Sequence, residues 1–339
     1  MPSHDAFLLV SFGGPEHRDD VIPFLRNVTR GRNVPPARLE RVAGHYYQFG
    51  GVSPINQQNR DLLAAVEKDF AASGVDLPLY WGNRNWHPYL ADTVAAMTAA
   101  GVRSALAFVT SAYSSFSGCR QYLGDIASAR AAAGERAPRI DKLRHYYNHP
   151  GFIEPFADAT AAAIASLGLP GPGDADLVFT AHSIPVAMNQ ASGPGGGAYQ
   201  AQLTEAARLV AERAGARSWR LAYQSRSGPP SQPWLGPDVN DCLRELAAAG
   251  SRAVVLVPVG FVCDHLEVRY DLDTEAARTA ASLGLGLARA ATPAADSRFA
   301  AMVTELVRER LDRTRPRALG SLWPAPGTCG PGCCGGMAG

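Results

Sequence analysis

Three carboxylates, Glu267, Asp271 and Glu275, follow a histidine at four-residue intervals in VCDHLEVRYDLDTEA (262–276). Because each helical residue turns the chain by about 100°, their side chains fall within roughly 80° of one another on one helix face. Like charges at this spacing repel by about a few tenths of a kcal/mol per pair, so a bound cation would account for them. Without a cation, Asp264 and Glu267 match a capping box, and the remaining stripe could be a solvated face.

A second histidine stands where another element should meet this stripe. His182, in FTAHSIP (179–185), comes just past the end of a buried strand, and Pro185 resists further strand pairing. The strand AVVLVPVGFV (253–262) delivers the acidic helix to the same sheet edge. A histidine and a carboxylate facing each other there would handle protons and a divalent metal, and Fe(II), Mn(II) or Zn(II) suits such ligands. A histidine that only hydrogen-bonds a loop is the alternative.

Six cysteines occur in the chain, and three of them, Cys329, Cys333 and Cys334, lie within its last eleven residues. In a reducing cytosol such clustering indicates a metal or iron–sulfur site rather than disulfides. The C-x₃-C-C spacing differs from the paired C-x₂-C of zinc ribbons. We expect Cys242, within a predicted helix, and Cys263, before the acidic helix, to be buried thiols.

Short apolar segments alternate with longer helix-like ones along the chain. The expected strands are 6–12, 77–82, 104–109, 175–181, 219–224 and 253–262. Apolar strands without polar alternation are buried on both faces, as in a parallel sheet. The expected helices are 55–72, 89–100, 120–133, 152–167, 198–214, 238–249, 266–282 and 297–313. The alternation predicts an α/β protein with two doubly wound, Rossmann-like domains and a ligand cleft between them.

The Pro/Gly-rich segment 167–176 lies near the middle of the predicted strands and marks a soft boundary between the domains. We place an N-terminal domain at 1–150 and a C-terminal domain at 151–315. The cysteine-rich tail (residues 316–339) is too rich in Pro and Gly for regular structure.

The overall charge argues against two classes of partner. Lys and Arg number 32 against 31 Asp and Glu, and a net charge of +1 indicates neither nucleic acid nor an anionic membrane surface. The first residues do not resemble a leader, and no stretch approaches about 18 apolar residues. We therefore expect a cytoplasmic protein without a transmembrane segment that acts on a small molecule.

Several loops suit the walls of a ligand site. SFGGPE (11–16) matches neither GxGxxG nor a P-loop, so its glycines are expected at a tight turn or against a ligand. The segments 45–56, 110–125 and 223–239 are rich in aromatic and small residues. Flat apolar walls of this kind suit a large planar ligand, although aromatic residues are more often part of a core.

Five of these stretches together resemble the ferrochelatase family, whose members insert ferrous iron into a porphyrin. The matching stretches, in the family's order, are LLVSFGGPE (8–16), YYQFGGVSPIN (46–56), FTAHSIP (179–185), QSRSGPPSQPWLGP (224–237) and VPVGFVCDHLEVRYDLDTE (257–275). The resemblance implies two Rossmann-like domains around a porphyrin cleft. It places His182 and Glu267 at the catalytic metal-insertion site, with Asp271 and Glu275 continuing a track for the substrate Fe²⁺.

The resemblance also implies porphyrin contacts. The matching residues are Phe12, Thr29, His45, Tyr46, Ser53 and Tyr122. Ser53 and Tyr122 match positions that contact porphyrin carboxylates, whereas several relatives have arginine in place of Thr29 and His45. Phe12 stands where some relatives direct a tyrosine toward the iron, and phenylalanine cannot coordinate.

The tail resembles that of the cluster-binding members of the family. Cys119, in SGCRQY (117–122), is then the fourth ligand of a [2Fe-2S] cluster with Cys329, Cys333 and Cys334, since such a cluster needs four thiolates. The cysteine spacing differs from that of other cluster-bearing relatives. A zinc site or no metal at all is the alternative.

The cluster motif and the Ala-, Gly- and Arg-rich composition resemble the actinobacterial members, whose substrate is coproporphyrin III. We therefore expect a monomeric lyase of haem biosynthesis that converts coproporphyrin III and Fe²⁺ into Fe-coproporphyrin III and two protons, and that meets other enzymes of the pathway. The alternatives are a protoporphyrin IX ferrochelatase or another tetrapyrrole chelatase. A non-catalytic iron–sulfur sensor or haem carrier on the same scaffold is the alternative from a different class.

Overall fold

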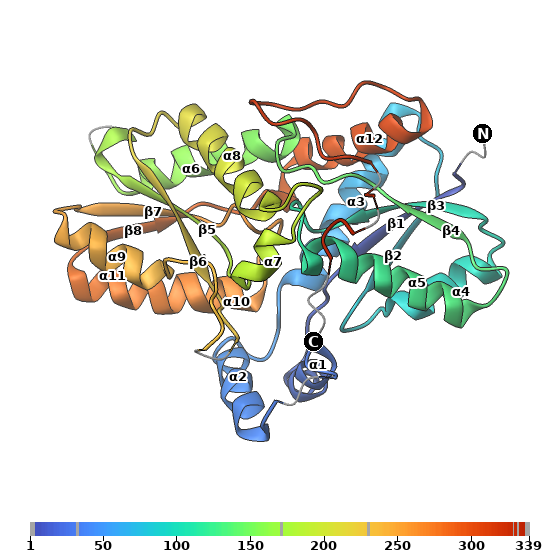
Figure 1. Ribbon diagram of the computed structural model, residues 1–339, viewed down its shortest axis with the longest axis horizontal. Helices are drawn as coiled ribbons and strands as arrows, with labels where there is room; N and C mark the ends of the chain where they lie inside the picture. The colour runs from blue at the N-terminus through green and yellow to red at the C-terminus, as the bar shows by residue number, and fades with distance from the viewer. Residues whose placement is uncertain are drawn as a thin grey trace.

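Two four-stranded parallel sheets form the frame of the molecule (Figure 1). The computed structural model describes residues 4–31, 34–169, 172–228, 231–327, 329–330 and 332–335. The strand orders are β2-β1-β3-β4 and β6-β5-β7-β8, so the two sheets repeat one doubly wound pattern. The strands are β1 (Ala6–Ser11), β2 (Leu79–Asn83), β3 (Ser104–Val109), β4 (Arg139–Lys142), β5 (Asp176–His182), β6 (Trp219–Gln224), β7 (Ala253–Val257) and β8 (Gly286–Arg289).

The α/β class and the six apolar strands predicted from the sequence are confirmed, with two corrections. β7 ends at Val257 rather than at 262, because the following Pro258 has no N–H for the ladder. β4 and β8 were not predicted. Both are four-residue edge strands whose residues are partly exposed, so they lack the continuous apolar run that marks a buried strand.

Helices cover both faces of each sheet (Figure 1). Those of the first half are α1 (Val21–Val28), α2 (Pro36–Gln48), α3 (Ile55–Ser73), α4 (Leu90–Ala99) and α5 (Gln121–Ala133). Those of the second half are α6 (Pro150–Ser166), α7 (Val186–Gln190), α8 (Ala198–Arg213), α9 (Val239–Ala248), α10 (Leu266–Val268), α11 (Ala277–Leu283) and α12 (Ser297–Leu311). Short 3₁₀ or π turns are η1 (Arg18–Asp20), η2 (Phe116–Arg120), η3 (Pro172–Asp174), η4 (Arg269–Ala276) and η5 (Pro293–Ala295). Helices α1 and α2 project on the side of the molecule opposite α12.

The two halves share one large buried core. It joins residues of β1 and β3 with residues of β5 and β7, and α12 packs against both α3 and α6. The Tyr113 hydroxyl donates to the Val259 carbonyl oxygen at 2.8 Å, and the Asp264 amide donates to Gln58 Oε1 at 2.9 Å. These bonds cross between the halves close to the carboxyl ends of the central strands. The domain boundaries at 150 and 315 stay predictions.

The tail runs back over both halves after α12 (Figure 1). Arg144 pairs with Glu309 at 2.7 and 2.8 Å and donates to the Arg317 carbonyl at 2.9 Å. Asn148 donates to the Leu322 carbonyl at 2.9 Å, and the Tyr147 hydroxyl donates to that of Trp323 at 2.8 Å. The segment expected to lack regular structure is therefore held by side chains that precede α6. Among the described helices, none has the length and apolar content needed to cross a membrane.

Candidate active site

His182 ends strand β5, at the carboxyl edge of the second sheet. The strand order reverses between β5 and β7, and ligands bind at such a switch point in doubly wound folds. The chain leaving β7 reaches this edge and enters α10, with Glu267 in the first turn. Nε2 of His182 lies 4.0 Å from Oε2 of Glu267, and the two side chains are 38% and 49% exposed. A solvent-accessible histidine and carboxylate thus face each other at this edge.

The start of the acidic helix differs from the predicted capping box. His265 is the N-cap, and its Nδ1 accepts a hydrogen bond from the Val268 amide at 3.2 Å. Asp264 instead accepts two bonds from the Arg289 guanidinium, at 3.1 and 2.9 Å. The capping box is therefore wrong, because an arginine distant in sequence binds Asp264. Glu267 turns toward His182 rather than toward its own first turn.

The acidic stripe lies on a helix that changes its winding. α10 continues into the π-helix η4 and then into α11. π-Helical segments are rare and occur mostly at functional sites. Since a π turn takes slightly more than four residues, side chains four apart still share one side of the helix. The predicted alignment of Glu267, Asp271 and Glu275 is therefore compatible with this winding, although a plain α-helix was expected.

Asp271, the carboxylate behind Glu267, is held by the end of the neighbouring strand. Gln224 pairs with His182 in the register of β5 and β6, and its Nε2 donates to Asp271 Oδ2 at 3.1 Å. The Ser225 hydroxyl donates to the same oxygen, from a residue with a φ of 59° that non-glycine residues rarely adopt. Burial raises the pKa of Asp271 to about 7, and the Ser225 bond opposes this rise. Asp271 therefore exchanges its proton near neutral pH.

His45, on α2 of the first half, reaches the far end of the acidic stripe. Its ring stacks on that of Tyr270, with centroids 3.7 Å apart and an angle of 7° between the planes. Burial lowers the pKa of His45, and the charges of Glu275 and Glu267 oppose this effect. The imidazole therefore lies within electrostatic reach of two of the three carboxylates.

His265 is a further histidine at the site that sequence reasoning did not assign. Burial lowers its pKa, with the Glu267 charge opposing and the His182 charge adding to the decrease. Its ring meets Phe261 edge-on, with centroids 5.0 Å apart. The signal available in the sequence was its position two residues before Glu267.

Phe12 and Tyr46 belong to an aromatic cluster of the first half that packs against the start of the acidic helix. The Phe24 ring lies 6.3 Å from that of Phe12 and 5.9 Å from that of Tyr46. Leu266 of α10 packs into the same cluster. Burial raises the pKa of Tyr46 well above its usual value, and the Glu267 charge adds to this rise. The Tyr46 hydroxyl is therefore neutral and lies near the carboxylates.

Ser53 and Thr29 lie in different surroundings. Ser53 is buried, and its amide donates a hydrogen bond to the Pro15 carbonyl at 2.8 Å. A Cβ added to Gly14 would come within 2.7 Å of the Ser53 Cβ. Glycine therefore allows the turn after β1 to approach Ser53 closely. The Thr29 hydroxyl donates to the Leu25 carbonyl at 2.8 Å, at the end of α1. Among the described residues, the hydrogen bonds of the Thr29 hydroxyl go to α1 itself and not to the other predicted porphyrin residues.

Arg84 was not predicted, yet it connects two residues that were. Its guanidinium carbon lies 4.9 Å from the ring centroid of Tyr122 and 5.9 Å from that of Phe12. It also pairs with Asp125, and the Arg84 side chain is only 11% exposed. Burial raises the pKa of Asp125, with the Arg84 charge opposing. Its place directly after β2, at the carboxyl edge of the first sheet, was the signal that could have indicated it.

Four cysteines gather between α5 and the tail. Cys119, Cys333 and Cys334 form one buried cluster with Leu123, and the sulfurs of Cys333 and Cys334 are 3.9 Å apart. Hydrogen bonds from Cys119 and Cys333 lower the pKa of Cys329. Within the described residues, no three His, Cys, Asp or Glu side chains are arranged to hold a metal ion. The four predicted cysteines therefore lie close together, and their thiols contact one another.

The two remaining cysteines are free and buried, as predicted. Burial raises the pKa of Cys242 to about 11 and that of Cys263 to about 12. Cys263 packs with Ile55 and Ala294, and Phe12 lies against this group. Both thiols therefore stay protonated at neutral pH.

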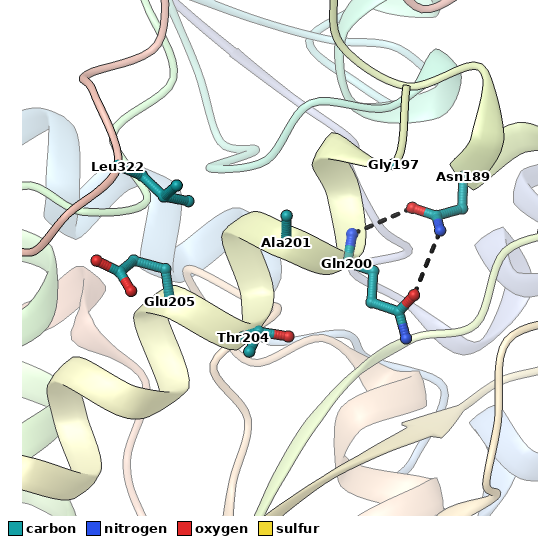
Figure 2. A pocket seen from close by; sticks show the side chains of 7 residues that line it. All are labelled: Asn189, Gly197, Gln200, Ala201, Thr204, Glu205 and Leu322. Carbon is teal, nitrogen blue, oxygen red and sulfur yellow. Dashed lines mark hydrogen bonds between the residues drawn. The ribbon is translucent and has the colours of Figure 1, made fainter. Parts of the chain in front are cut away.

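Two hollows on the surface lie away from His182 and Glu267. One of about 400 Å³ lies along α8 beside the tail. Figure 2 shows Asn189 and Gln200 hydrogen-bonded at one end of it, with Glu205 and Leu322 at the other. The second, of about 380 Å³, lies between α1 and α2. Neither contains a residue of the acidic stripe in its lining.

The fold and this site define an α/β protein of two doubly wound sheets, with a histidine and a carboxylate stripe at a switch point. The family profile described as Ferrochelatase matches residues 4–311. The chain is 56% identical to the coproporphyrin III ferrochelatase of Nocardia farcinica, over 97% of this chain and 96% of that one. It is 51% identical to the ferrochelatase of Rhodopirellula baltica, over 98% and 94%. The chain belongs to the ferrochelatase family and is a lyase.

Solved structures agree with the fold. SirB from Bacillus subtilis with Fe³⁺ matches with a TM-score of 0.54 at 13% identity, over 91% of this chain and 97% of that one. Such a likeness supports the arrangement of strands and helices alone. It confirms the predicted chelatase-like class.

Proposed function

We propose that the protein inserts Fe²⁺ into coproporphyrin III, a step of haem biosynthesis that yields Fe-coproporphyrin III and releases two protons. Relatives named coproporphyrin III ferrochelatase support this substrate, and the one from Mycolicibacterium smegmatis is 54% identical over 96% of this chain. The observation that carries the proposal is the 4.0 Å approach of His182 Nε2 to Glu267 Oε2 at the switch point, with Asp271 held behind them.

The chemistry of metallation suits these groups. Fe²⁺ must exchange water ligands for pyrrole nitrogens, and two pyrrole protons must leave. His182 accepts a proton, since its Nδ1 is bound to the Ser183 carbonyl and Nε2 faces Glu267. Glu267 binds the arriving iron or passes protons outward. Asp271 and Glu275 continue the path for Fe²⁺ along the same helix, where oxygen ligands suit a weakly held divalent ion.

The porphyrin lies against the first half of the chain in this proposal. Phe12 and Tyr46 supply the apolar wall, and Ser53, Tyr122 and His45 contact the rim of the ligand. We add Arg84, because a guanidinium beside Tyr122 suits a carboxylate of the substrate. Thr29 is the weakest member of the set, since its hydroxyl is engaged within its own helix.

The test of the substrate is anaerobic metallation followed by visible absorption. Purified protein, Fe²⁺ and either coproporphyrin III or protoporphyrin IX are mixed at equal concentrations. We expect the four-carboxylate substrate to be metallated at least about tenfold faster, because each lost charged contact removes roughly 1.5–3 kcal/mol. Equal or faster turnover of protoporphyrin IX would overturn the choice of substrate. Porphyrin binding without any metallation would instead favour a haem carrier.

We further propose that Cys119, Cys329, Cys333 and Cys334 hold a [2Fe-2S] cluster. The number and kind of donors suit such a group, since Cys119, Cys333 and Cys334 pack together, Cys329 is hydrogen-bonded to Cys119, and a cluster takes four thiolates. Among the described residues these thiols are not arranged around a metal position, so binding of the cluster would have to rearrange them. When bound, the cluster would supply a redox-active group. Cys333→Ala should abolish the visible absorption that an iron–sulfur cluster gives to a protein. Colourless wild-type protein with bound zinc would contradict the cluster.

We also propose that the enzyme acts in the cytoplasm as a monomer that meets other enzymes of haem biosynthesis. Six free cysteines support a reducing compartment, where thiols persist without pairing. Light scattering of the purified protein tests the monomer, and fractionation of cells that produce it tests the compartment. A stable dimer or a membrane-bound pool would contradict these two proposals respectively.

A further inference from the structure

The backbone at His182 lies past the end of the β5–β7 ladder. β7 pairs with β5 only as far as Phe179, which lies opposite Val257. Beyond it the Gly260 amide donates to the Thr180 carbonyl at 3.0 Å. Because the carbonyl groups of a strand alternate between its two neighbours, the next one on the β7 side belongs to His182. β7 has ended before this position, so the His182 carbonyl needs a donor from elsewhere.

Tyr199, in the first turn of α8, supplies this donor. Its hydroxyl donates to the His182 carbonyl at 2.8 Å, and Tyr199 is only 7% exposed. The Tyr199 amide donates to Ser192 Oγ at 2.9 Å, and its ring meets that of Tyr113 edge-on, with centroids 6.2 Å apart. Burial raises the pKa of Tyr199, so its hydroxyl is protonated at neutral pH. Tyr199 is therefore a buried, fixed donor to the backbone of the proposed proton acceptor.

The next residue, Ser183, is held by two other donors of its own. Its amide donates to the Gln224 carbonyl at 2.8 Å, and its hydroxyl donates to the Leu235 carbonyl at 2.7 Å. The Leu235 amide in turn donates to the Ile184 carbonyl at 3.0 Å. Ser183 is buried, and β6 ends at Gln224, so the Ser183 carbonyl also lies past the ladder. These bonds fix the direction in which that carbonyl points.

The Ser183 carbonyl determines the tautomer of the His182 ring. Its oxygen lies 2.5 Å from Nδ1, and a carbonyl oxygen can only accept a hydrogen bond, so Nδ1 carries the proton. In the neutral ring the free lone pair is then on Nε2, the atom that lies 4.0 Å from Glu267 Oε2. The other tautomer would place a proton on Nε2 and remove the proton acceptor from this side of the ring.

We propose that Tyr199 and Ser183 are positioning residues for iron insertion, which hold the His182 backbone so that the ring keeps its proton on Nδ1 and offers Nε2 to a pyrrole proton. This inference rests on the proposed function, in which His182 accepts that proton. Without either hydroxyl, the peptide groups on both sides of Ser183 can rotate, and the bond from Nδ1 weakens. A misplaced acceptor slows proton transfer, and one hydrogen bond corresponds to roughly a two- to tenfold change in rate.

The experiment uses three substitutions of the full-length protein that each remove one hydroxyl. Tyr199→Phe and Ser183→Ala remove the two proposed holds. Tyr146→Phe is the matched control, because the buried Tyr146 hydroxyl donates to the Val109 carbonyl at 3.1 Å, at the end of β3 in the other sheet. Anaerobic metallation of coproporphyrin III gives kcat and KM.

A second measurement does not depend on metallation. Nitrogen magnetic resonance of metal-free protein labelled with ¹⁵N-histidine shows which ring nitrogen carries the proton. Spectra are recorded near pH 9, where an ordinary histidine is neutral. The spectrum of His182→Ala identifies the His182 signals among those of the eight histidines.

We expect Tyr199→Phe and Ser183→Ala each to lower kcat about three- to tenfold, to leave KM within about twofold, and to raise the fraction of His182 with the proton on Nε2 several-fold. Tyr146→Phe should match wild type in kcat and in tautomer, although it also loses a buried hydrogen bond. An unchanged tautomer in Tyr199→Phe overturns the inference, and a lower kcat without a tautomer change overturns it as well, because that is the result of a merely structural role. If Tyr199→Phe does not fold, an unchanged tautomer in Ser183→Ala overturns it.

The two measurements also separate this inference from the proposed function. Wild-type protein that metallates coproporphyrin III while His182 carries its proton on Nε2 overturns the inference alone. Wild-type protein that metallates neither porphyrin overturns the proposed function, and the role of Tyr199 and Ser183 in iron insertion falls with it. Metallation by wild type, together with a slower rate and a shifted tautomer in both hydroxyl variants, supports the inference.

Discussion

His182 and Glu267 come from different strand ends, and this separate origin makes their roles testable one at a time. We predict that His182→Ala or Glu267→Gln lowers the metallation rate at least about 100-fold, the usual contribution of a positioned acid or base. Porphyrin binding should change little, because the aromatic wall lies on the first half. Anaerobic absorption measures the rate, and quenching of porphyrin fluorescence measures binding.

Glu135→Gln is the matched control for this pair of variants, since Glu135 is exposed in the turn after α5. It should metallate at the wild-type rate. A rate within threefold of wild type for either His182→Ala or Glu267→Gln would remove that residue from the mechanism. Unchanged rates with weakened porphyrin binding would assign it to the substrate contacts instead.

Asp271 makes a separate prediction about pH. Burial raises its pKa to about 7, whereas an aspartate in an unfolded chain has a pKa of about 3.9. Between these values the folded protein binds more protons than the unfolded one, so this site loses stability as the pH rises. Asp271→Asn removes the ionisation. The variant should therefore unfold at a higher temperature than wild type above about pH 7, with the difference vanishing near pH 4.

Thermal unfolding of iron-free protein in a chelating buffer at several pH values measures this effect. Asp273→Asn is the control, because Asp273 lies on the same π-helix. The Asp273 carboxylate pairs with Arg289, whereas the Asp271 carboxylate is buried without a cation. A constant difference between Asp271→Asn and wild type from pH 4 to pH 8 would show that the Asp271 carboxyl does not titrate near neutrality.

Single residues also show where sequence reasoning stops. The four-residue spacing of Glu267, Asp271 and Glu275 identified an acidic stripe, because periodicity is a local property. The capping box failed at Asp264 because its partner, Arg289, comes 25 residues later and no local rule reaches it. Arg84 was missed for the same reason, since its contacts with Phe12 and Tyr122 form only when three separate segments meet.

At the scale of elements, Arg289 of β8 fixes the entry of the acidic helix. Its guanidinium binds Asp264 before α10 and Asp273 within η4, the latter at 2.6 and 3.1 Å. The Arg289 side chain is 18% exposed, so this is a partly buried network. We predict that Arg289→Gln lowers the free energy of unfolding by about 2–4 kcal/mol, since it leaves two carboxylates without their cation. Metallation should slow about tenfold or more, because Glu267 is no longer held in place.

Arg220→Gln is the matched control for the arginine substitution. Arg220 pairs with Glu245 at 3.0 Å on the surface, with side chains 44% and 59% exposed. Such a pair contributes less than about 1 kcal/mol, and its loss should leave metallation unchanged. Denaturant unfolding gives the stability of both variants. Equal stability losses would mean that the Arg289 network does not act as a buried clamp.

Elements differ in how far the sequence predicts them. The central strands β1, β3, β5 and β7 were found because both faces are buried and the apolar residues are therefore continuous. The edge strands β4 and β8 were not, since each has four residues with polar or small side chains. The other two edge strands, β2 and β6, were predicted because their segments carry more apolar residues. The π winding of η4 was also missed, because the residues of the segment match an ordinary α-helix and the winding is set by tertiary contacts.

At the scale of the whole molecule, the two sheets repeat one strand order, and hydrogen bonds join the halves near the carboxyl ends of the central strands. Phe12 follows β1 and His182 ends β5, so each half delivers a site residue from the strand at its own switch point. The tail then joins the halves a second time. It leaves α12, passes Glu205 on α8, and brings Cys333 and Cys334 to Cys119. Composition predicted a tail without regular structure, but not which residues hold it.

Gly320 is the place where this attachment can be tested. Glu205 is buried, pairs with Arg208 at 2.9 and 3.0 Å, and accepts the Ser321 amide at 2.8 Å. Gly320 has a φ of 77°, and a Cβ there would lie 1.9 Å from Glu205 Oε1. Gly320→Ala must therefore displace the Glu205 carboxylate from its donors. We expect a stability loss of about 2–4 kcal/mol, which combines backbone strain with the loss of charged hydrogen bonds.

Gly284→Ala separates the two contributions, because Gly284 has a φ of 69° and nothing within 4 Å of an added Cβ. It should cost only the strain of the left-handed backbone, about 1–2 kcal/mol, and should leave the tail in place. The specific readout is the rate at which a thiol reagent labels Cys333 and Cys334 in cluster-free protein. Gly320→Ala should raise that rate several-fold, and Gly284→Ala should not. Two other hydrogen bonds hold the end of the tail, from Arg120 Nε to the Cys333 carbonyl and from the Gly193 amide to Cys334 Sγ. Equal labelling rates in the two variants would mean that these bonds keep the tail on the cysteine site without Glu205.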